Sequence, residues 1–199
     1  MGKSMKLKIA IGALAALMLA GSGSAIAQGT PTANAGVSPA LCKVAPRSIE
    51  SLNGIVEALP SDGTDVRVPV RFGPGEGDPT DDLTIHDITN VVVEMAACLN
   101  AGDVLRLYAL FSDDGLKPAL VPNDLFAAEA ATPKALSAEN QFPMPILWDA
   151  RVQNDGRVTA LVDLDGEVAL VTFVWNGDRY LIDLWDDQIA SDATPPAGA

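Results

Sequence analysis

The chain has 199 residues, 26 of them acidic and 13 basic, which gives a formal net charge of −13 at pH 7. Nucleic acids and anionic lipid surfaces repel such a protein, so these two classes of partner are excluded. The acidic residues are scattered rather than grouped in blocks, a pattern typical of a solvated surface.

The first 27 residues have the layout of a secretory signal peptide. Three lysines precede an apolar run over residues 9–20, and small residues follow up to Ala27, after which we expect cleavage. The run is shorter than the roughly 20 residues that span a bilayer, so a retained membrane anchor is the weaker alternative. We therefore expect an exported protein, secreted or on the exterior of the cell envelope, with 10 basic and 26 acidic residues and no membrane contact.

Cys42 and Cys98 are the two cysteines of the chain. An exported protein folds in an oxidising compartment, where a pair of cysteines usually forms a disulfide. The bond would hold an N-terminal arm on a predicted helix. Two buried free thiols are the alternative.

The N-terminal part of the exported chain carries weak structural signals. Residues 28–40 are rich in Gly, Pro, Thr, Ser and Ala, with Val37 as the one side chain apolar enough to pack, which predicts a flexible linker before an arm over residues 41–80. In the arm, apolar spacing predicts a short helix over Ser48–Leu59, and alternation predicts an edge strand over Val66–Phe72. The glycine-rich residues 73–79 read as a loop without a ligand.

Three helices are predicted next. Thr84 can cap a helix that Gly102 ends, and Asp103 can cap a second helix that breaks at Ser112–Gly115. A third helix is expected over Asn123–Ala131, before a proline.

The C-terminal part, Ile146–Trp185, predicts an antiparallel meander of four strands. Turn residues at Asn154–Gly156, Asp165–Gly166 and Asn176–Gly177 separate four runs rich in β-forming residues. Residues 188–199 read as a disordered tail.

The order of these segments resembles a known family. A helix closing in Leu99–Asp103, a second ending in Leu110–Asp114, and a meander finishing with Asp178–Asp183 are similar to the SnoaL-like group of the nuclear-transport-factor-like superfamily. The resemblance covers residues 81–187 and implies an α+β cone, in which a curved four-stranded antiparallel sheet wraps two to three helices. Members include isomerases, cyclases, hydrolases and binding modules, so the fold implies no single activity.

The turns also predict which side chains share a face of the sheet, because side chains alternate along a strand. The inner face is expected to be apolar, with these rows: Trp148, Val162, Ala169, Leu184; Ala150, Ala160, Val171, Ile182; and Val152, Val158, Phe173, Tyr180. The outer face mixes acids with an apolar patch that a dimer partner or the arm would cover: Leu161, Val168, Leu170, Val174, Leu181 and Trp185.

Candidate functional residues follow from these faces. The inner face lacks carboxylates and histidine, so Asp163 and Asp183 are only weak catalytic candidates that a bulge would have to turn inward. If small residues leave a cavity, an apolar pocket would be lined by Tyr108, Trp148, Phe173, Trp175 and Tyr180. Ordinary close packing is the alternative.

A lone histidine, His86, lies near Asp82 and Asp87, but one histidine with surface carboxylates is a poor metal site, and we expect no metal or cofactor. The leading hypothesis is a non-enzymatic exported module that binds a small apolar molecule or a protein partner, as a homodimer. An isomerase, cyclase or hydrolase of the same fold is one alternative. A structural dimerising domain with a filled core is another.

Overall fold

The structure, a computed structural model, describes residues 36–60, 72–120 and 132–187. Several predicted segments lie outside the described residues: the signal peptide over 1–27, the start of the linker over 28–35, most of the strand over 66–72, the helix over 123–131 and the tail over 188–199.

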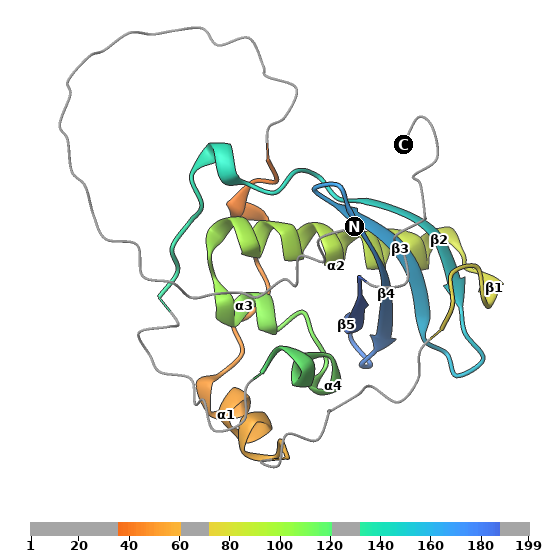
Figure 1. Cartoon of the computed structure of the whole chain (residues 1–199), viewed down its shortest axis with the longest axis horizontal. Helices are drawn as coiled ribbons and strands as arrows, with labels where there is room; N and C mark the ends of the chain where they lie inside the picture. The colour runs from red at the N-terminus through yellow and green to blue at the C-terminus, as the bar shows by residue number, and fades with distance from the viewer. Residues whose placement is uncertain (1–35, 61–71, 121–131, 188–199) are drawn as a thin grey trace, which may run out of the picture. The chain divides into compact units, whose positions relative to one another are not determined.

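The described residues form an α+β fold with a five-stranded antiparallel sheet, whose strands follow sequence order from β1 to β5 (Figure 1). The predicted meander is confirmed as four of these strands: β2 (Ile146–Val152), β3 (Val158–Leu164), β4 (Glu167–Trp175) and β5 (Tyr180–Asp186).

The strand count was wrong by one, because a short strand β1 (Asp78–Pro79) lies in the predicted loop and pairs with β2. Two features bring the residues before β1 close to the end of β2. Gln153 donates a hydrogen bond of 2.8 Å from its side-chain amide to the Glu76 carbonyl. Gly77, at a φ of 93°, lies so close to the Val152 carbonyl that a Cβ would come within 2.5 Å of it.

The helices are α1 (Ile49–Glu57), α2 (Asp82–Ala101), α3 (Val104–Tyr108) and α4 (Asp113–Leu116), with short 3₁₀ turns at Pro39–Leu41, Lys117–Ala119 and Ala138–Asn140. The predicted helix before Pro60 is therefore confirmed. So are the end of α2 at Gly102, which adopts the left-handed conformation, and the cap of α3 by Asp103.

Two predicted helix boundaries were wrong. The cap of α2 is Asp81, not Thr84: the Asp81 carboxylate accepts hydrogen bonds from the backbone and side chain of Thr84, and these lower its pKa. The predicted break at Ser112–Gly115 begins a new helical turn, α4, because the Ser112 hydroxyl accepts the Gly115 N–H at 2.9 Å.

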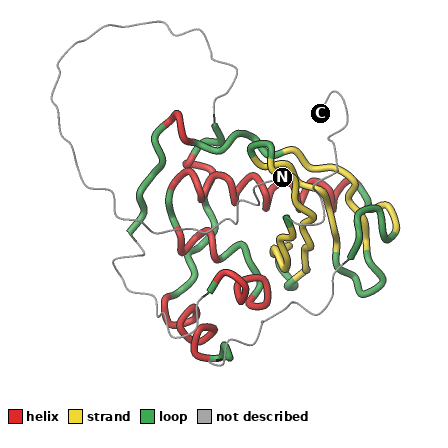
Figure 2. The backbone as a smooth tube through the Cα atoms, in the orientation of Figure 1, coloured by secondary structure: helices red, strands yellow, loops and turns green. Residues whose placement is uncertain are grey.

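The inner face of the sheet packs on α2, which runs along it (Figure 1 and Figure 2). Ala160, Val162, Val171, Phe173 and Ile182 are fully buried there, in one cluster with apolar residues of α2. The small side chains on this face thus lie in a packed core.

The register between β3 and β4 is as predicted, with Val158 opposite Phe173 and Val162 opposite Ala169. Between β4 and β5 it is shifted, because Trp175 pairs with Tyr180. The Asn176 side chain accepts the Asp178 and Arg179 N–H groups, which moves the turn one residue along the chain.

Two β-bulges overturn the predicted positions of two tryptophans. In β2 the register shifts between Trp148 and Arg151, so Trp148 lies opposite Leu161 on the outer face. In β5 a bulge at Asp183 places Trp185 opposite Val171, and Trp185 packs against the main core. The sequence assigned Trp148 to the inner face and Trp185 to the outer face; each bulge adds one residue and inverts the alternation beyond it.

The disulfide between Cys42 and Cys98 is confirmed and joins the arm to α2. Within the linker predicted up to residue 40, Gly36 is partly buried and Val37 is buried. Asn100 explains this packing: its fully buried side chain donates hydrogen bonds to the carbonyls of Val37 (2.7 Å) and Phe142 (3.1 Å) and accepts the Phe142 N–H at 2.7 Å.

Candidate binding site

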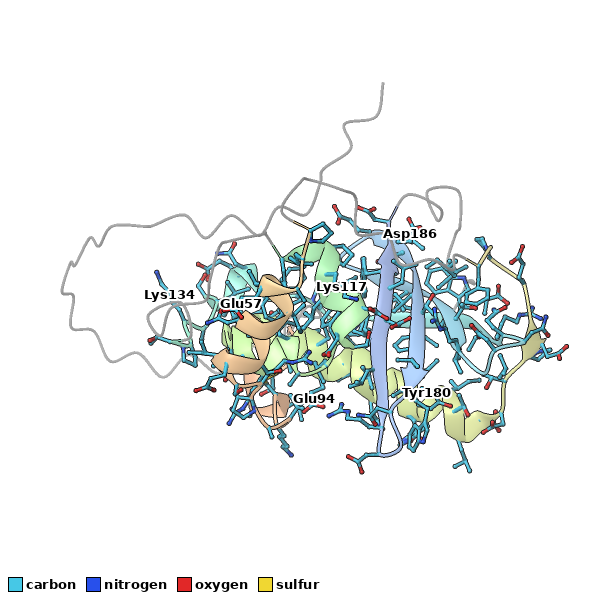
Figure 3. All side chains as sticks on the ribbon, turned by 90° about the horizontal axis from the view of Figure 1, so that it is seen from below. Glu57, Glu94, Lys117, Lys134, Tyr180 and Asp186 are labelled. Carbon is cyan, nitrogen blue, oxygen red and sulfur yellow. A yellow bond between two sulfur atoms is a disulfide. The ribbon has the colours of Figure 1, made fainter. Side chains whose placement is uncertain are left out.

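A surface groove of about 330 Å³ lies where the β4–β5 turn meets α2. Its lining comes from two parts of the chain: Asp87, Asn90 and Val91 of α2, and Trp175, Asp178, Arg179 and Tyr180 around the turn. Tyr180 marks the groove end of β5, and Asp186 marks the opposite end of the strand (Figure 3).

The aromatic side of the groove is formed by Trp175 and Tyr180, the residues on either side of the turn. Their rings meet edge to face, with centroids 5.1 Å apart and an interplanar angle of 65°. Trp175 is 48% exposed. An exposed indole beside a depression offers a flat surface on which a ligand can stack.

Arg179 is held at the groove by Glu94 of α2, which accepts a hydrogen bond of 2.9 Å from the guanidinium. The other carboxylate oxygen of Glu94 accepts the backbone N–H groups of Lys43 and Val44, at 2.9 and 2.6 Å. One carboxylate thus fixes both the arm beside the disulfide and the cation at the groove.

Among the described residues, the two carboxylates that line the groove, Asp87 and Asp178, have no strong partner. Asp87 lies 3.5 Å from the exposed His86 imidazole, and within the described part of the chain Asp178 forms no ion pair. The groove therefore combines aromatic surface with excess negative charge.

The structure brings together two of the five residues predicted to line a pocket, Trp175 and Tyr180. Phe173 and Tyr108 lie in the packed core, and burial raises the pKa of the Tyr108 phenol. Trp148 lies on the outer face.

The weak catalytic candidates have structural contacts. Asp163 accepts the Gly166 N–H at 2.7 Å and so closes the β3–β4 turn. Asp183, at the β5 bulge, is 4% exposed. Its carboxylate accepts a hydrogen bond of 2.6 Å from the Ser112 hydroxyl and lies 3.1 Å from the Arg157 guanidinium. It fastens the start of α4 to the sheet.

On the outer face, Leu161 and Leu170 are 5% and 4% exposed and form a separate small cluster with Trp148 and Val168. Val174 and Leu181 lie opposite each other nearby and are partly buried. Five of the six residues predicted for this patch therefore share the face, and Trp185 does not.

Within residues 36–60, 72–120 and 132–187, no group of three or more His, Cys, Asp or Glu side chains is placed to hold a metal ion. In the same residues, no helix has both the length and the apolar character needed to cross a membrane.

No protein-family model matches the chain, and neither does any curated protein or solved structure. What the groove binds has therefore to be inferred from its own chemistry. The sequence did not single out Asn90, Asp178 or Arg179 as site residues. One signal was available: Asp87, Asn90 and Val91 follow i, i+3, i+4 spacing and so share one face of α2.

Proposed function

We propose that the chain is an exported, SnoaL-like binding module, and that it takes a small molecule in the groove between α2 and the β4–β5 turn. The single observation that carries this proposal is the half-exposed Trp175, which lies beside Tyr180 in the groove described above. A volume of about 330 Å³ is within the range of small-molecule sites.

The filled interior supports a surface site over an enclosed apolar pocket. Phe173, Val171 and Ile182, which would line such a pocket, are fully buried in contact with other core residues. An enzymatic role has less support, because the buried carboxylate of Asp183 is occupied by Ser112 and Arg157.

The test is a fragment screen by ligand-observed NMR on the full chain and two tryptophan variants. Trp175→Ala removes the exposed indole of the groove, and Trp148→Ala is the matched control on the outer face. We expect fragments that bind the wild type to bind Trp148→Ala and to lose binding to Trp175→Ala. Binding that survives in Trp175→Ala, or a wild type that binds no fragment, would contradict the proposal.

A further inference from the structure

We propose that the groove recognises a cationic ligand, specifically a small molecule carrying an alkylammonium group. This inference rests on the proposed function, because it names the chemistry of the ligand that the groove takes.

The charges around the groove support a cation. Asp87 and Asp178 line it, and the charge of Arg179, the one basic residue among the described residues that line it, is offset by Glu94 at 2.9 Å. Two negative charges remain, so an anionic ligand would be repelled. An ammonium group between them would gain Coulomb attraction from both carboxylates.

The aromatic residues point to the same chemistry. The face of an indole attracts cations more strongly than other side-chain rings do, through its quadrupole. Trp175 leaves about half of its surface open to solvent, and Tyr180 meets it edge to face. Asn90 adds a neutral polar group from α2. Aromatic surface combined with carboxylates is the arrangement that binds quaternary and alkylated ammonium groups.

The decisive experiment compares two probes of the same shape that differ in charge: choline and its uncharged carbon isostere, 3,3-dimethylbutan-1-ol. Each is titrated into the full chain at pH 8, where histidine imidazoles are usually neutral, and the indole N–H signal of Trp175 is followed by NMR. We expect choline to bind about tenfold more tightly than the isostere.

Matched variants locate the effect. The double variant Asp87→Asn/Asp178→Asn should reduce the preference for choline to about twofold, because both remaining carboxylates are neutralised. The control is Asp165→Asn/Glu167→Gln, which makes the same change in net charge at the exposed β3–β4 turn. It should keep the tenfold preference, since exposed charges at a distance are screened.

The outcomes separate the two proposals. Equal affinity for both probes would overturn the cationic ligand and leave the binding groove intact. A preference for choline that persists in Asp87→Asn/Asp178→Asn would also overturn it. Failure of both probes to shift the Trp175 signal would overturn the groove as a binding site together with its ligand.

Discussion

The two ends of α2 differ in how their polar groups are used. At its C-terminal end, beside the arm, the side chain of Asn100 is fully buried with both its oxygen and nitrogen hydrogen-bonded, and Cys98 is cross-linked to Cys42. Nearer its N-terminal end, Asp87 faces a groove with an exposed Trp175. The first region satisfies its polar groups within the protein, whereas the second leaves the side chains of Trp175 and Asp87 about half exposed. Substitutions at the C-terminal end of α2 should therefore change the free energy of unfolding, and substitutions at the groove should change ligand binding.

The largest expected effect comes from removing the disulfide, in Cys42→Ala/Cys98→Ala. The bond closes a loop with a sequence separation of 56 residues. Restoring the freedom of that loop in the unfolded chain should lower the free energy of unfolding by about 4 kcal/mol. Urea denaturation measures the loss. Choline binding by the folded fraction should be unchanged, and a change in stability below about 1 kcal/mol would contradict this account of the arm.

Asn100→Ala should lower the free energy of unfolding by about 3 kcal/mol, because it removes the partner of the partly buried Phe142 N–H and of the buried Val37 carbonyl. The control is Asn140→Ala, which removes an exposed side-chain amide that donates a hydrogen bond to Ser137; we expect it to lower the free energy of unfolding by about 0.5 kcal/mol or less. Chemical denaturation of both variants measures the two losses in the free energy of unfolding. Equal losses would mean that the arm does not depend on Asn100.

Two helical glycines give the next comparison. In Gly115→Ala the new Cβ would come within 2.5 Å of the Ile182 carbonyl, so α4 must move away from β5, at a cost of about 2 kcal/mol. In Gly54→Ala the Cβ meets nothing within 4 Å, and the better helix former should stabilise α1 by about 0.5 kcal/mol or more. Melting curves should shift in opposite directions; a destabilised Gly54→Ala together with a neutral Gly115→Ala would refute the packing of α4 described here.

The smallest expected effect is a pH dependence. Burial raises the pKa of Tyr108 above its ordinary value of 10.0, so the folded state favours the neutral phenol. The contribution of the neutral phenol to the stability of the folded state is fully present below pH 10 and is lost as pH rises through the folded pKa. Tyr108→Phe should flatten the loss of stability above pH 10, whereas Tyr180→Phe in the groove should retain it. An unchanged alkaline profile in Tyr108→Phe would argue against burial of this phenol.

Much of the fold could be predicted because local residues determine it. Asp165 and Gly166 supply the positive φ angles of their turn and so set the β3–β4 register. Gly102 and Asp103 mark the end of one helix and the start of the next. The disulfide followed from the count of two cysteines and the expected compartment.

The rest depends on tertiary contacts that no local pattern records. The bulge in β2 places Asp149 at a φ of 51°, a conformation that Asp tolerates but that its position in an alternating strand does not announce. The groove forms where a face of α2 meets a turn far along the chain, so Asp178 and Arg179 could be recognised as site residues only from the folded structure.

The central claim is that ligands bind at the groove and not in the interior of the sheet. A map of amide chemical-shift changes during titration of the full chain with choline tests it most directly. We expect changes at Asn90, Asp178 and Arg179 and at the Trp175 indole, with the core residues Phe173 and Ile182 unaffected. Changes centred on Phe173 and Ile182, with the groove signals unmoved, would contradict the account.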